Sequence, residues 1–181
     1  MTRAELIEAL AGRFYPRFAD GMAAEVLAAD AVGLLYDLAT EPEALPRAVR
    51  HKVVWRGAYV LERIFFTRPE AFAPYAARFC SRDFAACVDP GARRSFAKTM
   101  AALLRADEVA PEALDRIAEA AAEWTLDPAT KTAVRVWALE ILNRCRSRVE
   151  WVAASWDDLL AAATLRSSPG VLCRLRRIRY E

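Results

Sequence analysis

The feature that most constrains this 181-residue chain is a recurrence of apolar side chains about every forty residues, a period typical of repeat architectures. A first set recurs at a spacing of 41 residues and consists of Trp55, Phe96 and Trp137, each followed four residues later by Tyr59, Met100 or Ile141. A second set recurs at a spacing of 42 residues and consists of Phe72, Leu114 and Trp156, then Tyr75, Ile117 and Leu159, then Phe79, Ala121 and Ala163.

These offsets place the recurring residues on helices. Matching positions within a segment lie three or four residues apart, so they share one helical face. A pair of helices cannot bury such a face alone, whereas stacked pairs cover one another. The alternative is coincidence in a chain that is 55% apolar, and one turn further on Glu62, Leu103 and Arg144 do not match. We expect a real repeat.

Local start and stop signals divide the chain into eight to nine expected helices, and no segment alternates as a strand would. Thr2 and Glu5 form a capping box, and the Asp-Pro pairs at 89–90 and 127–128 combine an acidic N-cap with proline at the first helical position. The expected helices cover 3–14, 18–39 and 46–66, then start near 69, 90, 111, 128 and after 149, with a short last helix that ends near 178.

Two turn-and-helix segments resemble the HEAT repeat, in which an acidic turn precedes a helix that opens with a small or β-branched residue and arginine. They are Asp89-Pro90-Gly91-Ala92-Arg93-Arg94 and Asp127-Pro128 through Val134-Arg135, and Ala138, Leu139, Ile141 and Leu142 fit the later part of the pattern. The layout over roughly residues 45–180 is similar to short, uncharacterised bacterial HEAT-like proteins. The resemblance implies a scaffold that grips partners on an extended surface. A related helical-repeat group excises alkylated bases from DNA, but no residue set of this chain maps onto such a site.

The expected fold is all-α: a right-handed α-α superhelix, armadillo-like or HEAT-like, of about four stacked helix pairs with no sheet. It forms one domain, 1–181. Helix pairs are expected at 46–83, 90–126 and 128–166, with capping helices at 1–45 and a basic capping helix at 167–181.

The residue inventory argues against familiar catalysis. His51 is the one histidine, it lies between Arg50 and Lys52, and we expect it at the surface or partly packed. The six glycines form no phosphate-binding loop, and the neighbours Asp157 and Asp158 point to different faces of a helix. We therefore expect no enzyme activity, catalytic residue, cofactor or metal.

The cysteines and the apolar stretches indicate a cytoplasmic protein. Four cysteines at no metal-like spacing are expected to be small buried side chains in a reducing compartment: Cys80, Cys87, Cys145 and Cys173. The N-terminus shows no secretory signal. Charged residues interrupt each apolar stretch well before the roughly 20 residues that a membrane span requires.

Basic residues near helix starts and at the C-terminus are candidate contacts for an anionic partner: Lys52, Arg93, Arg94, Arg135, Arg174, Arg176, Arg177 and Arg179. Positive charge at a helix N-terminus opposes the macrodipole, so another interaction should favour it. One interpretation is a structural ladder in which arginines pair with Asp89 and Asp127 of adjacent repeats. The other is a basic ridge for phosphate or an acidic partner.

Arginine dominates the basic residues, since only three of the 26 are lysine: Lys52, Lys98 and Lys131. Coding bias explains this, and so does arginine's bidentate recognition of phosphate or carboxylate.

Three of the five tryptophans belong to the recurring sets and are expected in the core, whereas Trp124 and Trp151 could line a surface groove.

These observations favour a non-catalytic scaffold that binds another protein. The alternative is a nucleic-acid-binding helical-repeat protein, a divergent relative of the alkylated-base repair group. A net charge of +2 and a pI near 8.4 fall short of the basicity of a dedicated nucleic-acid domain.

Overall fold

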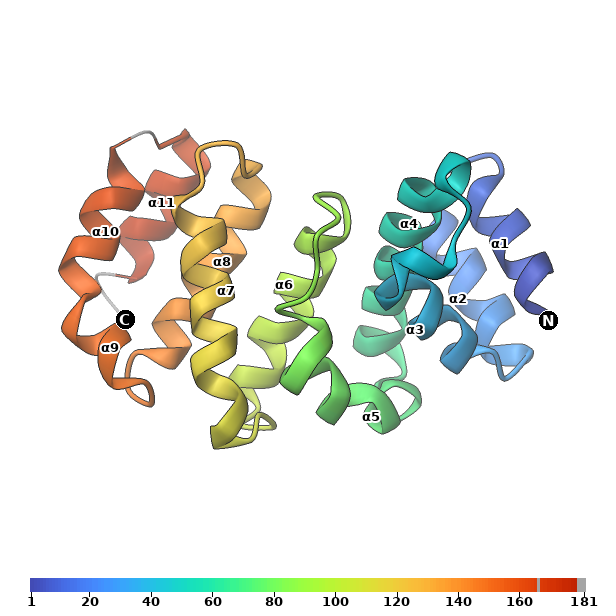
Figure 1. Ribbon diagram of the computed structural model, residues 1–181, viewed down its shortest axis with the longest axis horizontal. Coiled ribbons are helices and arrows are strands. Elements are labelled where there is room, and N and C mark those ends of the chain that lie inside the picture. Colours follow the sequence, from blue (N-terminus) through green and yellow to red (C-terminus); the bar gives the residue numbers. More distant parts are fainter. Residues whose placement is uncertain (166, 179–181) are drawn as a thin grey trace. The chain divides into compact units, whose positions relative to one another are not determined.

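The computed structural model describes residues 1–165 and 167–178, and the regular structure in this part of the chain is helical (Figure 1). Eleven α-helices and short 3-10 and π-helical turns bring the helical share to 77%, with no β-strand among the described residues. The expected all-α class is therefore confirmed. None of the described helices combines the length and the apolar character that a membrane crossing needs.

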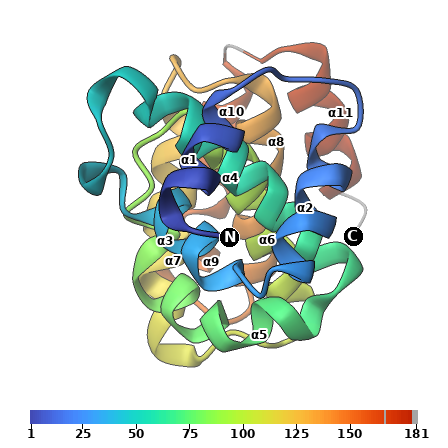
Figure 2. The ribbon, with the colours of Figure 1, turned by 90° about the vertical axis from the view of Figure 1, so that its right-hand side faces the viewer.

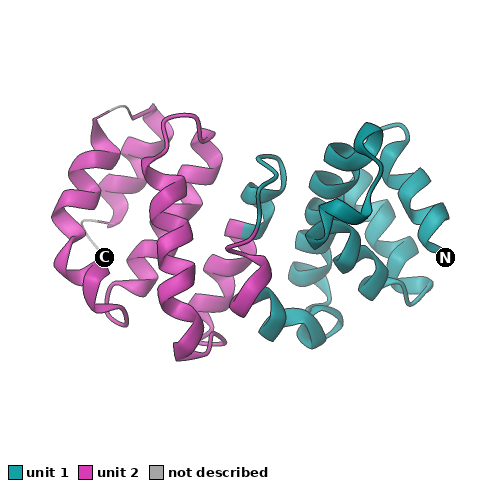
Figure 3. Cartoon of the chain, in the orientation of Figure 1, with its two compact units in different colours: residues 1–79, 87–96 teal, residues 80–86, 97–181 magenta. Residues whose placement is uncertain are grey.

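The chain forms two compact units (Figure 3). The first comprises Met1–Phe79 and Cys87–Phe96, and the second comprises Cys80–Ala86 and Ala97–Glu181. Helix α6 (Ala92–Arg105) begins in the first unit and continues into the second.

Helix α4 (Arg47–Thr67) is the centre of the first unit. Four helices pack against it: α1 (Arg3–Ala11), α2 (Phe18–Ala28), α3 (Val32–Thr40) and α5 (Pro69–Arg78). Figure 2 shows α4 behind α1 and α2. Buried residues occupy several sides of α4, so it can be covered from several directions. At Gly57 the approach of α3 is closest, because an added Cβ would lie only 3.3 Å from the Cβ of Ala39.

The second unit packs its helices in a chain of neighbours. Its helices after α6 are α7 (Leu114–Leu126), α8 (Thr132–Cys145), α9 (Glu150–Ala154), α10 (Trp156–Thr164) and α11 (Pro169–Ile178). Helix α7 contacts α8 and α10, and α11 contacts the same two helices.

Trp124 is fully buried with its ring centroid 4.8 Å from that of Phe84, so the expectation that it lines a surface groove is wrong. Trp151 is half-buried, and its indole nitrogen donates to Asp115 at 3.2 Å.

The helix count is higher than the expected eight to nine because two predicted helices are broken. The segment 18–39 divides at Asp30, whose φ of 49° is left-handed. The N–H of Ala31 donates to the carbonyl of Val26 at 2.9 Å, the hydrogen bond of a Schellman motif that ends α2. The segment after 149 divides at Ser155, between α9 and α10.

The two acidic turns differ in how they start a helix. The Oδ1 atom of Asp89 accepts from the N–H groups of Gly91 and Ala92 at 2.8 and 2.9 Å, and α6 starts at Ala92, close to expectation. The carboxylate of Asp127 instead closes a turn through Ala129 and Thr130, so α8 starts at Thr132 rather than near 128. Within the first unit the second carboxylate oxygen of Asp89 lies 2.6 Å from Nδ1 of His51, and the arginine ladder between repeats stays a prediction.

Two buried arginines satisfy helix-end carbonyls. Arg56 is 7% exposed, and its Nη1 donates to the carbonyl oxygens of Leu10 and Gly12 at 2.7 Å each, at the end of α1. Arg135 is also 7% exposed, and it donates to Thr125 in α7 at 2.9 Å and to Ala163 in α10 at 3.2 Å. Because the last carbonyls of a helix lack partners within it, these guanidiniums replace water at buried helix ends.

Replacing Arg135 by alanine should therefore destabilise the protein. The change leaves two interior carbonyls without this donor, and we expect a loss of about 3 kcal/mol in the free energy of unfolding. Arg94 lies 41 residues earlier but is exposed, so Arg94→Ala should change that free energy by less than about 0.5 kcal/mol. Urea unfolding followed by circular dichroism measures both, and equal effects would contradict the carbonyl role.

Candidate functional site

Two consecutive aromatic residues, Phe14 and Tyr15, stand exposed on the loop between α1 and α2. Phe14 is 47% exposed and Tyr15 is 39% exposed. The ring of Phe14 lies 5.0 Å from that of Phe18 and 5.4 Å from that of Trp55 in α4, measured between centroids. Tyr15 lies 5.2 Å from Phe18 in an edge-to-face arrangement. Both rings are thus partly open to solvent and yet packed against the helices.

The guanidinium of Arg56 lies beneath the rings of Phe14, Phe18 and Trp55. Its Cζ is 5.3 Å from the ring centroid of Phe14, 5.7 Å from that of Phe18 and 5.3 Å from that of Trp55. These are cation–π distances. Within the described residues Arg56 has no carboxylate partner, and its Nε makes no hydrogen bond. We call Phe14, Tyr15, Trp55 and the underlying Arg56 the aromatic patch.

The rim of the aromatic patch is polar and basic. One turn before Trp55, the Nδ1 atom of His51 lies 2.6 Å from the Oδ2 atom of Asp89. Lys52, the neighbour of His51, is exposed. Gly91 lies against Trp55 so closely that an added Cβ would be 2.7 Å from the Trp55 Cβ, so the absence of a side chain there lets Trp55 keep its place.

The aromatic patch and its rim present aromatic ring faces, apolar ring edges and cations. These groups can bind a partner through packing, cation–π contacts and ion pairs. The groups with raised pKa values are thiols outside the aromatic patch. Among the described residues no group of three or more His, Cys, Asp and Glu side chains could hold a metal ion.

The candidate basic residues have different environments in the structure. In the first unit Lys52 and Arg94 are exposed, whereas Arg93 is half-buried and its Nε donates to the carbonyl of Cys87 at 3.0 Å. In the second unit Arg135 is buried against helix-end carbonyls, and Arg176 and Arg177 are exposed. Arg179 lies outside the described residues.

Arg174 ties α11 to α8. Its Nη1 lies 2.9 Å from the Oε2 atom of the buried Glu140, and its Cζ lies 5.9 Å from the ring centroid of Trp137. The Oε1 atom of Glu140 also accepts from Arg144 at 2.9 Å. Arg174 is thus engaged by the fold of the second unit.

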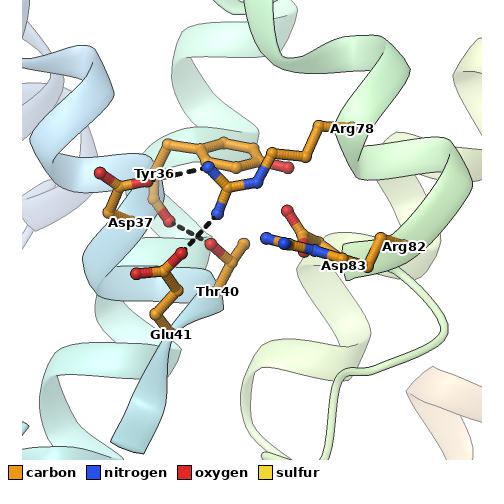
Figure 4. Close-up of polar contacts among 7 residues, drawn as sticks. All are labelled: Tyr36, Asp37, Thr40, Glu41, Arg78, Arg82 and Asp83. Atoms are coloured by element: carbon orange, nitrogen blue, oxygen red, sulfur yellow. Dashed lines mark hydrogen bonds and ion pairs between the residues drawn. The ribbon is translucent and has the colours of Figure 1, made fainter. Parts of the chain in front are cut away.

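A third arginine cluster, shown in Figure 4, joins α3 and α5 within the first unit. The Nη1 of Arg78 lies 3.2 Å from Asp37 Oδ1, and its Nη2 lies 2.8 Å from Glu41 Oε1. The guanidinium also lies over the ring of Tyr36, 5.1 Å from its centroid. Since both acids balance the cation, this cluster is a structural contact between two helices.

Sequence reasoning missed Phe14, Tyr15 and Arg56. The two aromatics fall outside the recurring sets, at the end of the first expected helix and just before Pro16. Arg56 stands inside the apolar run of α4 and has no visible partner in the sequence. Adjacent aromatics in a predicted loop, where apolar burial is not expected, were the available signal.

Cysteine reactivity tests whether the thiols of Cys80, Cys87 and Cys145 are buried and unreactive. Burial raises the pKa of Cys80 to about 11 and those of Cys87 and Cys145 to about 12. At pH 8 about 0.1% or less of each is thiolate, the reactive form. Cys173 is exposed. We expect one thiol of the native protein to react rapidly with Ellman's reagent and all four to react in denaturant; three fast thiols in the native protein would contradict this.

Arg174 and Arg176, both in α11, allow a matched test of the ion pair between Arg174 and Glu140. Arg174→Ala leaves the buried Glu140 with one arginine fewer and should cost about 2 kcal/mol of unfolding free energy. Arg176 is exposed, so Arg176→Ala should stay within about 0.5 kcal/mol of the unchanged protein. Thermal unfolding of the two variants decides, and a larger loss for Arg176→Ala would refute the assignment.

No family model, no curated protein and no solved structure matches the chain. The HEAT-like resemblance therefore stays a prediction from the sequence. What the aromatic patch does is inferred from its own contacts, burial and charge.

Proposed function

We propose that this protein is a non-catalytic interaction module that binds another protein through the aromatic patch of the first unit. One observation carries the proposal. Phe14 and Tyr15 are exposed, adjacent in sequence and held in place by Phe18 and Trp55 above a buried guanidinium.

The composition of the aromatic patch is that of an interface centre. Aromatic residues and arginine are enriched where protein surfaces meet and supply most of the binding energy there. A single exposed apolar residue is ordinary, but neighbouring rings packed on a third ring form a contiguous surface. Because these rings are already packed, little side-chain freedom remains to be lost on binding, and this favours affinity.

The framework that we propose is HEAT-like, with helix pairs stacked in a right-handed superhelix. The first recurring set falls in α4, α6 and α8, and the second falls in α5, α7 and α10 or, for Phe79, directly after α5. Within the second unit, α7 packs on α8 and α10 and α11 packs on both, as neighbouring layers of a solenoid do. Such layers present rows of helices as a surface for partners.

The alternative is a nucleic-acid binder. Exposed aromatics stack on bases, and Lys52 and Arg94 are exposed cations of the same unit. Arg135 and Arg174, however, are engaged by the fold of the second unit, which reduces the set of basic candidates available for phosphate. Binding that falls steeply with salt would favour this alternative.

Site-specific photo-crosslinking tests the proposal. The photoreactive amino acid p-benzoylphenylalanine would replace Phe14 in the full-length protein, and native lysate would be irradiated. Phe66, also in the first unit and 43% exposed, is the matched control position. We expect a protein adduct from position 14 that is absent from position 66.

Two other results would count against the proposal. Equal adducts at both positions, or none at either, would remove the protein-binding role of the aromatic patch. An adduct that nuclease digestion abolishes would replace it with the nucleic-acid alternative.

A further inference from the structure

We propose that the aromatic patch recognises an acidic peptide segment that also carries an apolar side chain. The apolar side chain packs on Phe14 and Trp55, and the carboxylates of the segment face the surrounding cations. This inference rests on the proposed function and adds the chemistry of the partner.

Helix α4 and the loop 12–17, which carry the rings of the aromatic patch, are basic, and the acid at its rim, Asp89, pairs with His51. From Arg47 to Leu61, helix α4 contains three arginines, one lysine and His51 but no aspartate or glutamate. The loop 12–17 adds two arginines and again no acid. Its Arg17 pairs with Asp20. Arg13 and Lys52 are exposed and form no ion pair with any described residue.

The cations of α4 gather near its N-terminus. Arg47, Arg50, His51 and Lys52 occupy its first two turns. Arg50 pairs with Glu43 at 3.2 Å and His51 with Asp89 at 2.6 Å, whereas Arg47 and Lys52 are exposed and form no ion pair with any described residue. Cations near a helix N-terminus are repelled by the macrodipole, so this distribution costs stability within the chain. An approaching carboxylate is attracted by the dipole and by Arg47 and Lys52 together, so these two residues complement an anion.

Arg56 places a buried positive charge under the aromatic patch. The side chain is more than nine-tenths buried. It donates hydrogen bonds to two carbonyl oxygens and lies over three aromatic rings, but it has no carboxylate partner among the described residues. Its Nε makes no hydrogen bond. A buried cation without a counter-ion gives the surface above it a positive potential, because little water is present to screen it.

The geometry of the rings favours a peptide as the source of the anion. Phe14 rests on Trp55 of α4, whereas the hydroxyl of Tyr15 lies over the backbone of Gly21 in α2. Both rings also contact Phe18 of α2, so the exposed surface runs from Trp55 of α4 across Phe14 to Tyr15, and an extended segment can contact both rings. Arginine's fork matches carboxylates in two-point contacts, and the phenyl ring of Phe14 suits leucine or phenylalanine of the segment.

Selection from a display library of random 12-residue peptides tests the inference. The full-length protein is the bait, and Phe14→Ala and Phe66→Ala are run in parallel. We expect the peptides enriched by the unchanged protein to be net negative and to contain leucine or an aromatic residue. Phe66→Ala should enrich the same peptides, and Phe14→Ala should not.

Charge reversal then measures the electrostatic part. Fluorescence anisotropy with the most enriched peptide should show affinity about tenfold weaker for Arg13→Glu/Lys52→Glu, equivalent to about 1.4 kcal/mol. Arg116 is an exposed arginine of α7, and Arg116→Glu should leave the affinity unchanged. Neither variant should unfold at a lower temperature than the unchanged protein.

Neutral or basic enriched peptides, no enrichment, or undiminished enrichment by Phe14→Ala would overturn the inference. So would a twelve-nucleotide oligo(dT) that binds more tightly than the best peptide. These failures are separable from failure of the proposed function: a protein adduct at position 14 without acidic peptides retains the interface and removes its acidic partner.

Discussion

The interaction on which both units depend is a guanidinium that donates to carbonyl oxygens at helix ends. The last carbonyls of a helix have no partner within it, and burying them without a donor costs free energy. Arg56 serves the end of α1, and Arg135 serves α7 and α10 together. The loops use the same device: Arg93 donates to Cys87, and Arg148 donates to Val109, at 3.0 Å each. The planar fork of arginine reaches two carbonyls in fixed directions, as a lysine ammonium cannot. Arg135 uses this geometry, with its Nε and Nη2 atoms on carbonyls of two different helices.

The need for such donors is linked to the way helices end in this chain. Glycine usually supplies the left-handed residue that closes a helix, yet no glycine among the described residues has a positive φ. Asp30 closes α2 and Asp107, with a φ of 58°, closes α6, where the N–H of Glu108 donates to the carbonyl of Leu103 at 3.1 Å. Aspartate tolerates this conformation better than most residues that have a Cβ. At the ends of α1, α7 and α10, which lack such a motif, arginines from other helices donate to the carbonyls instead.

This division explains what the sequence could and could not predict. The capping box of Thr2 and Glu5, the long helix α4 and the start of α5 at Pro69 were predicted because their signals are local. The break at Asp30 was missed, since an aspartate inside an apolar pattern is a weaker stop signal than glycine. The carbonyl acceptors of Arg56 lie 44 and 46 residues away in the sequence, so no local sequence pattern predicts them. The aromatic patch was missed for the same reason: its rings come from a loop and a distant helix.

Arg56 joins the architecture to the aromatic patch. The guanidinium that closes α1 is also the one on which Phe14 and Trp55 rest, so the exposed rings take their places from the same contact that ends the helix. A substitution at Arg56 would disturb both, and no measurement on it could separate folding from binding. Phe14 and Lys52 are different, because their side chains end at the surface and the helix-end hydrogen bonds do not pass through them. The aromatic patch can therefore vary at its rim while its base stays fixed, and a stable helical framework needs this property to acquire new partners without losing its fold.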